Sequence, residues 1–254
     1  MSDMGNYTAT GVRTDAALDP GLKKFMLGVY QKMGLGLLVS AALAWLTSSY
    51  APVSDLMFVK TPTGGLAGFT LLGMIVSFAP LVILLGSNFM MKRASAGSAN
   101  ILYWVIVALV GASLGTVVLM YAGASVVTTF LITAAAFGGL SLAGYTTKRD
   151  LSGMRSFIFF AMWGFVFAGI AFSIGASFGL FSVGPVFMIM NAVGILLMAG
   201  LIASETQHLK MIYYSVRGDG ESMSVATSFG ALNLYIAFVN LFRFLLYFMG
   251  VRRD

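Results

Sequence analysis

The chain contains no cysteine, and His208 is the only histidine among its 254 residues. The absence of cysteine excludes disulfides and thiolate metal sites, although it says little about the compartment. One histidine cannot supply most of the metal clusters that proteins build from imidazole and thiolate ligands. We therefore expect neither a metal site nor another cofactor.

Charge is also scarce. Charged residues make up 9% of the chain and hydrophobic residues 59%, whereas about 25% of residues are charged in soluble domains. The apolar runs are continuous over roughly 20 residues, the length of a membrane-spanning helix, and do not alternate like the strands of a barrel. The sequence therefore predicts an all-α membrane protein. Its net charge of +6 is typical of binding to nucleic acid or anionic lipid. Because the basic residues flank apolar runs, we expect a lipid bilayer and no nucleic acid.

Seven apolar segments predict seven transmembrane helices, at residues 25–50, 66–85, 101–121, 126–145, 157–177, 186–204 and 225–251. Polar loops are expected between them, notably at residues 51–64, 86–100 and 146–156, and the sixth helix is expected to continue to Tyr214. Residues 1–24 are interpreted as a mobile cytoplasmic N-terminal tail that lacks the pattern of a signal peptide. Residues 25–254 are interpreted as one transmembrane bundle.

The distribution of basic residues predicts the orientation in the membrane. If odd-numbered spans run outward, ten Lys and Arg side chains fall on one side and only Lys60, Arg252 and Arg253 on the other. Cytoplasmic loops carry the excess of basic residues, so the N-terminus is predicted to be cytoplasmic. A re-entrant last segment would bring the two C-terminal arginines inside, but residues 225–251 are long enough to cross.

Glu205 is the only acidic residue that falls inside or at the edge of a predicted span. An ionisable group there costs roughly 2.5–3.5 kcal/mol on insertion scales, so it normally faces the bundle interior or water and often marks a pathway. His208 follows three residues later on the same helical face. Glu205 would be neutral when helices close around it and charged when wetted, because burial disfavours the charged form. Both residues also have a simpler interpretation, as side chains at the end of a span that reach water.

The last span carries one stripe of small and polar residues: Gly230, Asn233, Ala237 and Asn240. In lipid such a stripe must turn inward to find partners. The two asparagines are expected either to hydrogen bond between helices or to line a pathway. Arg243 lies about 27 Å along the helix from the start of the span, so an ion pair between Arg243 and Glu205 is not expected.

Other patterns favour packing over chemistry. Small residues recur four apart at Gly36, Ser40 and Ala44, at Gly111 and Gly115, at Gly139 and Ala143, and at Gly200 and Ser204. This spacing allows helices to approach closely.

The sequence Gly-Ala-Ser-Leu-Gly at residues 111–115 matches a nucleophile elbow, but it lies in an apolar helix and lacks triad partners, so we expect no enzyme. The most polar interior loop is either solvated or binds a lipid headgroup or a partner; its charged residues are Lys148, Arg149 and Asp150.

Three motifs, in order and at the right spacing, resemble the Bax inhibitor-1 family, also called the transmembrane Bax-inhibitor-motif family. They are Tyr-Thr-Thr-Lys-Arg-Asp-Leu-Ser at 145–152, Ala-Gly-Leu at 199–201 followed by Glu-Thr-Gln at 205–207, and Leu-Tyr at 234–235 through Val-Asn-Leu-Phe at 239–242. The resemblance covers about residues 25–254, and the short loops are similar to those of the bacterial, YccA-type branch. It implies an inner-membrane bundle of seven helices, with the last helix central between two three-helix layers.

Members of the family are described as pH-sensitive calcium leak pathways in which two aspartates, on the last two helices, share a proton. The resemblance places Glu205 at the first of these positions and Ala237 at the second. The pair is therefore broken, and the coupled titration of two carboxylates is lost. Calcium binding also suffers, because Ca²⁺ takes six to eight oxygen ligands. Arg155 stands where the family often has a small residue.

Two functions are left open. The first is a pH-sensitive leak or channel for calcium or protons, with Glu205, Asn233, Asn240 and His208 at its gate. The second is a non-conducting modulator of a membrane-bound AAA protease, or a stress-survival factor, that acts through the N-terminal tail. The second follows from the resemblance, because YccA-like proteins are linked to an FtsH-type protease.

Overall fold

The computed structural model describes residues 19–62, 66–90, 95–179 and 183–253. These residues form long helices and one small hairpin, in agreement with the predicted all-α membrane protein. The helices are α2 (Pro20–Ser49), α3 (Ala51–Met57), α4 (Leu71–Met90), α5 (Ala96–Ser113), α6 (Gly115–Met120), α7 (Gly123–Thr146), α8 (Ser152–Ser177), α9 (Val183–Val216) and α10 (Gly220–Met249). The hairpin pairs β1 (Phe58–Lys60) with β2 (Leu66–Phe69) in antiparallel fashion.

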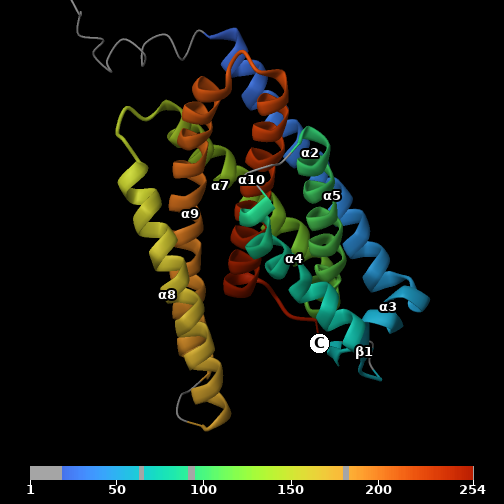
Figure 1. Cartoon of the computed structure of the whole chain (residues 1–254). Coiled ribbons are helices and arrows are strands. Elements are labelled where there is room, and N and C mark those ends of the chain that lie inside the picture. The colour runs from blue at the N-terminus through green and yellow to red at the C-terminus, as the bar shows by residue number, and fades with distance from the viewer. Residues whose placement is uncertain (1–18, 63–65, 91–94, 180–182, 254) are drawn as a thin grey trace, which may run out of the picture.

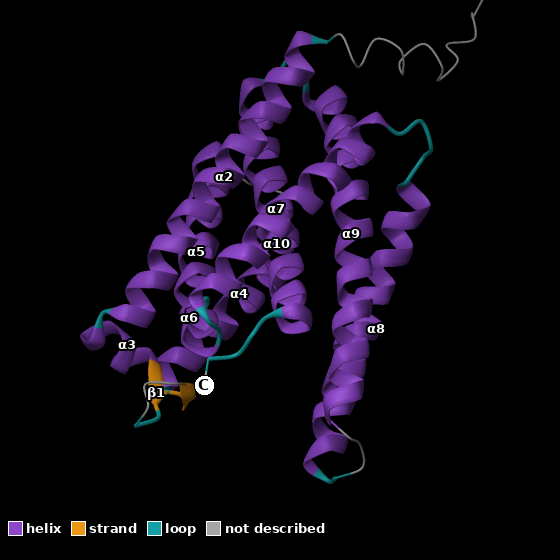
Figure 2. Cartoon of the chain, turned by 180° about the vertical axis from the view of Figure 1, so that it is seen from behind, coloured by secondary structure: helices purple, strands orange, loops and turns teal. Residues whose placement is uncertain are grey.

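Helix α10 is the centre of the bundle (Figures 1 and 2). It packs against α2 and α5 on one side and against α7 and α9 on the other. Helix α4 lies against α5 and α8 lies against α9, so three helices stand on each side. Buried residues make up 61% of the apolar window of α10 but only 6% of that of α8, because α10 is surrounded whereas α8 has one main neighbour. The predicted central position of the last helix is confirmed.

Within the described residues, six helical segments are long and apolar enough to cross a membrane, with α5 and α6 counted together. Helix α4 has a shorter apolar segment, Leu71–Gly86, and carries Pro80 in its interior. Proline removes a backbone hydrogen bond from the interior of a helix, so α4 is locally weakened at Pro80. The exact count of seven spans stays a prediction.

The two ends of the described chain lie at opposite ends of the bundle (Figure 1). After α10, the chain runs along the turn between α6 and α7. There Ala122 N–H donates to the Val251 carbonyl over 3.0 Å, and Arg253 N–H donates to the Met120 carbonyl over 2.9 Å. Helix α10 therefore runs the length of the bundle, which agrees with a full crossing and not with a re-entrant segment. The side that faces the cytoplasm stays a prediction from the basic residues.

The loop predicted at residues 51–64 is wrong in its first part, because residues 51–57 form α3 and residues 58–60 form β1. Met57 and Phe58 are buried with Leu119 in a small second core. That burial orders a segment whose prolines suggested only a loop. The second predicted span was placed from residue 66, but its helix, α4, begins at Leu71 because residues 66–69 form β2. The third is interrupted at Leu114, between α5 and α6. In the loop predicted at 86–100, residues 92 and 93 lie outside the described part.

Helix α2 begins at Pro20, before the predicted start of the bundle at residue 25. Asp19 caps the helix, and its Oδ1 accepts hydrogen bonds from Gly21 N–H over 2.8 Å and Leu22 N–H over 3.2 Å. Aspartate at the cap and proline in the first turn are both helix start signals. Leu22 is fully buried, so residues 20–24 belong to the bundle. The rest of the predicted tail, residues 1–18, lies outside the described part.

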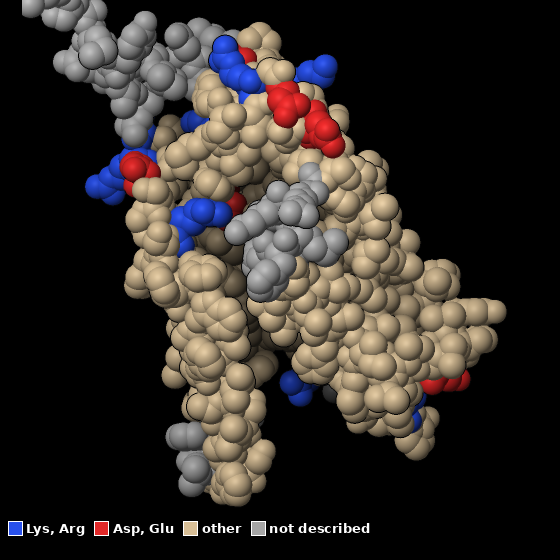
Figure 3. Space-filling model, in the orientation of Figure 1, with Lys and Arg blue, Asp and Glu red and all other residues tan. Residues whose placement is uncertain are grey.

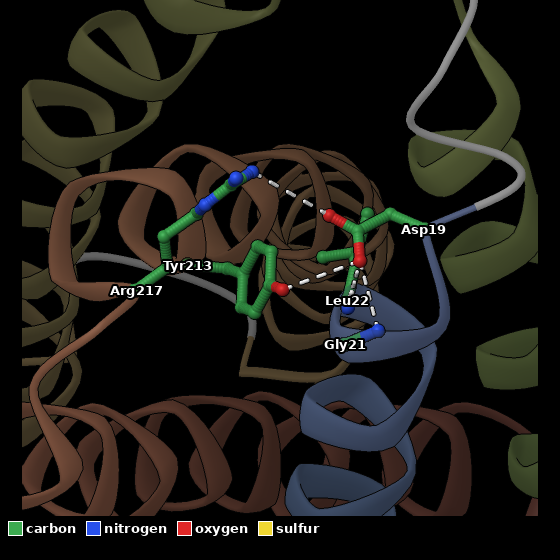
Figure 4. Close-up of polar contacts among 5 residues, drawn as sticks. All are labelled: Asp19, Gly21, Leu22, Tyr213 and Arg217. Atoms are coloured by element: carbon green, nitrogen blue, oxygen red, sulfur yellow. Dashed lines mark hydrogen bonds and ion pairs between the residues drawn. The ribbon is translucent and has the colours of Figure 1, made fainter.

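The Asp19 carboxylate also joins α2 to the end of α9 (Figure 4). Tyr213 OH donates to Asp19 Oδ1 over 3.3 Å, and Arg217 Nη1 lies 3.9 Å from Oδ2. The Arg217 side chain is 62% exposed, and exposed ion pairs contribute little to stability. The cap is therefore the main contribution of Asp19.

We expect Asp19→Ala to lower the free energy of unfolding by about 1 kcal/mol, the usual cost of losing an N-cap. Asp19→Asn should cost much less, because asparagine caps helices as well as aspartate does. Unfolding by sodium dodecyl sulfate in mixed micelles measures the difference, with Arg217→Gln as the control for the ion pair. Equal losses for the alanine and asparagine variants would assign the effect to charge and not to the cap.

Close helix contacts use most of the predicted small residues. A Cβ added at Gly111 would lie 2.6 Å from Ser40 Cα, so α5 and α2 approach backbone to backbone there. The predicted pair on α7 is wrong, because Gly139 borders open space. On this helix the close contact is made by Gly144, where an added Cβ would lie 2.8 Å from Ala203 Cα of α9.

Candidate functional site: a buried glutamate paired with arginine beside a cavity

Glu205 of α9 and Arg155 of α8 form an ion pair. Arg155 Nε donates to Glu205 Oε1 over 3.2 Å, and Arg155 Nη2 lies 3.1 Å from the same oxygen. The Glu205 side chain is 8% exposed and that of Arg155 is 40% exposed. Glu205 Oε2 is buried without a hydrogen-bond partner among the described residues. Because an unpaired buried acceptor is costly, the carboxylate is stabilised through one of its two oxygens only.

A cavity of about 240 Å³ lies beside this pair, between the first turn of α8 and the polar end of α9. His208 is half-buried and lies close enough to Arg155 and Glu205 for their charges to act on it. The structure therefore brings His208 and Glu205 together, as their spacing predicts, and adds Arg155. The cavity is lined by Leu151, Ser152, Arg155, Ser156, Ser204, Gln207, His208 and Met211.

Gln207 fixes the loop between α7 and α8 at the edge of the cavity. Its Nε2 donates to the Arg149 carbonyl over 2.7 Å, and Leu151 N–H donates to its Oε1 over 2.7 Å. The loop backbone is thus held by one amide while the charged side chains are exposed. These side chains form the predicted lipid or partner loop, Lys148, Arg149 and Asp150. Their binding role stays a prediction.

The polar stripe of α10 is divided between buried and exposed residues. Gly230 and Ala237 are buried, and Gly230 lies against Leu209 of α9. Asn233 is exposed and Asn240 is half-buried. Neither asparagine makes an interhelical hydrogen bond within the described residues. Three residues correspond to about 60° around a helix, so the asparagines turn away from the face that meets α9.

Glu205 nevertheless lies at the depth of this stripe. A second contact, Gly194 against Phe244, shows that α9 and α10 run antiparallel. Together with the Gly230 contact, it places Glu205 level with Asn233. The charged partner of Glu205 comes from α8 and not from α10. The lost acidic position, Ala237, is fully buried.

Hydroxyl groups join three helices on the other side of α9. Ser141 of α7 hydrogen bonds to Thr206 over 3.0 Å and also to Tyr30 of α2. Thr206 donates to the Ile202 carbonyl over 2.8 Å. Helix α9 is also held to α7 by Lys210, whose Nζ donates to the Tyr145 carbonyl over 2.7 Å, whereas the Glu205 carboxylate pairs with Arg155 of α8. A change in protonation of Glu205 acts directly on the α8 side alone.

Sequence reasoning noted Arg155 only as a departure from the family and missed its role. A signal was present, because Arg155 lies in the first turn of α8, where the positive end of the helix dipole disfavours a cation. A cation at that place needs an anion nearby, and Glu205 is the acid of the predicted spans. The pairing could not be predicted, because it joins residues 50 apart in the sequence and depends on α8 and α9 being neighbours.

Charged side chains on the face seen in Figure 3 lie mostly towards the end of the bundle at which α2 begins, and the rest of that face is apolar. Helices of spanning length around a central helix, with a buried carboxylate paired to an arginine of the neighbouring helix, define a polytopic helical membrane protein. The family profile described as "Inhibitor of apoptosis-promoting Bax1" matches residues 22–254. The chain therefore belongs to the Bax inhibitor-1 family, as the motifs indicate.

Relatives match the chain along almost its whole length. An uncharacterised protein of Caulobacter vibrioides is 52% identical and covers 100% of both chains. An uncharacterised protein of Rickettsia prowazekii is 37% identical over 99% of this chain and 100% of its own. The inner membrane protein YbhL of Escherichia coli is 36% identical over 95% of this chain and 98% of its own. The narrower placement in a YccA-type branch stays a prediction.

Proposed function

We propose that this chain is a bacterial inner-membrane protein that forms a pH-gated leak for small cations, with the Glu205–Arg155 pair as the gate. The observation that supports this most is the buried carboxylate, which has one oxygen held by Arg155 and the other without a partner. The inner membrane is suggested by the name of the relative YbhL. A cytoplasmic N-terminus is suggested by the excess of basic residues at that end.

Protonation of Glu205 would remove the charge that holds Arg155. The Oε2 atom has no partner, so it can take the proton without breaking another contact. Arg155, whose side chain is 40% exposed, can then turn through the cavity to water. The charged and titratable groups near Glu205 are Arg155 on α8 and His208 on α9, whereas neutral Asn233 of α10 lies at the same depth but turns away from α9. Helix α8 packs mainly against α9, so acidification would loosen this end of α8 and open a path.

The geometry supports protons over calcium as the permeant ion. Calcium takes six to eight oxygen ligands, and the described residues contain no group of three or more His, Asp or Glu side chains that could hold a metal ion. Ala237 offers no ligand at the position where the family has its second acid. Arg155 beside the carboxylate also repels a divalent cation.

Proteoliposomes loaded with a pH-sensitive dye test this gate. The wild-type leak should rise as the pH is lowered from neutral, and Glu205→Gln, which is uncharged at every pH, should leak about tenfold faster than wild type at neutral pH and lose the pH response. Glu221→Gln, at an exposed acid near the start of α10, is the matched control and should behave like wild type. A calcium dye in parallel should report no flux. Identical leaks of wild type and Glu205→Gln at every pH would remove Glu205 from the gate.

A second candidate is a non-conducting modulator of a membrane-bound AAA protease. It is favoured by the buried Ala237, because the coupled titration of two carboxylates is then not available to Glu205. In this case no variant leaks, and co-purification with an FtsH-type protease survives Glu205→Gln but is lost when residues 1–18 are deleted. A pH-dependent leak without association under mild crosslinking would exclude this role.

A further inference from the structure

The cavity beside Arg155 lies at the beginning of an apolar strip on α8. Ser152, Arg155 and Ser156 line the cavity from the first turn of this helix. Residues three and four apart share one helical face, so the strip continues along the same face. Its side chains are exposed and large: Phe159, Trp163, Val166 and Ile170. The cavity, with the Arg155 guanidinium at its edge, thus leads directly onto a hydrophobic strip.

The pocket favours a negatively charged group. At the start of α8 the Ser152 N–H already donates to Asp150 Oδ1 over 2.9 Å, so the positive charge that the cavity offers to an anion is mainly that of Arg155. Glu205 engages Nε and Nη2 of Arg155, while the rest of the guanidinium can reach the cavity. Basic residues also outnumber acidic ones in this loop and ion pair, with Lys148, Arg149 and Arg155 against Asp150 and Glu205.

We propose that this cavity binds the phosphate of a membrane phospholipid, with Arg155, Ser156 and His208 around the phosphate and an acyl chain along the strip on α8. The cavity volume of about 240 Å³ leaves room for a phosphate with its glycerol. From Arg155 to Ile170 the helix rises about 22 Å, enough to cover one leaflet of a hydrocarbon core about 30 Å thick.

The strip distinguishes a lipid from a free anion. Inorganic phosphate would need only the polar end of the cavity, whereas the aligned aromatic and aliphatic side chains give an acyl chain a continuous contact. The site is also independent of conduction. It requires the ion pair and the first turn of α8, and it would bind lipid whether or not the protein leaks ions.

Native mass spectrometry of the full chain in neutral detergent tests the site, with dioleoyl phosphatidylglycerol as the probe. One phosphatidylglycerol should bind per chain, and dioleoylglycerol, which lacks the phosphate, should bind at least about tenfold more weakly, because a charge-assisted hydrogen bond contributes about 1.5–3 kcal/mol. Equal binding of the two would overturn phosphate recognition. Displacement of the lipid by an equal concentration of inorganic phosphate would overturn the lipid as the occupant.

Two variants test whether the lipid binds in the cavity. Arg155→Gln removes the guanidinium, and Ser156→Phe fills the opening while the Arg155–Glu205 pair is kept. Each should weaken phosphatidylglycerol binding about tenfold. Lys24→Gln, at an exposed basic residue near the start of α2, is the matched control and should bind like wild type. Wild-type binding by Ser156→Phe would overturn the site. Lipid retention is measured without flux, so a failed leak assay does not affect this test.

Discussion

Replacing Arg155 by methionine should lower the free energy of unfolding at neutral pH by about 3 kcal/mol. The variant leaves Glu205, whose side chain is 8% exposed, without its cation. Removing one partner of a buried ion pair costs about 3–5 kcal/mol. The lower end applies here because the Arg155 side chain is 40% exposed, so the pair is partly screened by solvent.

The reverse substitution, Glu205→Met, should cost less than Arg155→Met, because Arg155 can turn to water when its partner is gone. The double variant should recover most of the loss, since replacing a buried ion pair by apolar residues is often neutral or stabilising. Unfolding by sodium dodecyl sulfate in neutral micelles without added phospholipid measures all three and keeps the proposed lipid site out of the comparison. A loss below about 1 kcal/mol for Arg155→Met would be that of an exposed pair and would contradict the burial of Glu205.

The cost of Arg155→Met should shrink as the pH falls. A protonated Glu205 is neutral and far less costly to bury than an unpaired carboxylate. The wild-type protein instead loses its ion pair in acid. The two stability curves should therefore converge towards low pH, and parallel curves would show that Glu205 keeps its charge over the range measured.

The course of the chain through the membrane could largely be predicted, because it depends on local composition. Apolar runs of about 20 residues mark spans wherever they occur, and the small residues Gly230 and Ala237 correctly indicated a helix with close neighbours. The start of α2 was missed although Asp19 and Pro20 are local signals, because the predicted span follows only the apolar run from residue 25. The helix α3 was missed because its order comes from burial of Met57 against a distant segment.

The candidate site could be predicted only in part. Glu205 stands out in the sequence as the acid among apolar residues, and the spacing of three places His208 beside it. Its partner Arg155 depends on which helices become neighbours, and no local pattern contains that information. Asn233 shows the opposite error, since polar residues on a central helix were expected to turn inward. A rotation of about 60° from Gly230 places Asn233 at the exposed edge of α10 instead.

A leucine at position 144 should prevent the folded bundle from forming, whereas a leucine at position 139 should be tolerated. A Cβ at Gly144 would lie 2.8 Å from both Cα and the carbonyl carbon of Ala203 and would fall still closer to its oxygen. These are backbone atoms of α9 and cannot rotate away, so α7 and α9 must separate. A Cβ at Gly139, on the same helix, meets nothing within 4 Å. Monodispersity in detergent and the unfolding curve measure the difference.

The expected loss in the free energy of unfolding for Gly144→Leu exceeds the roughly 1–3 kcal/mol that overpacking usually costs, because that range applies where side chains can adjust. Gly144→Ala should fall within it, and Gly139→Ala should be neutral or slightly stabilising, since alanine favours a helix over glycine. Separation of α7 from α9 would also break the Ser141–Thr206 hydrogen bond beside Glu205. The alanine variant should therefore disturb the pH response of the leak even where the protein still folds. If Gly144→Leu were as stable as Gly139→Leu, α9 would not be held against α7. The proposed gate would then fail as well, because the ion pair can release α8 only from a helix α9 that is itself fixed.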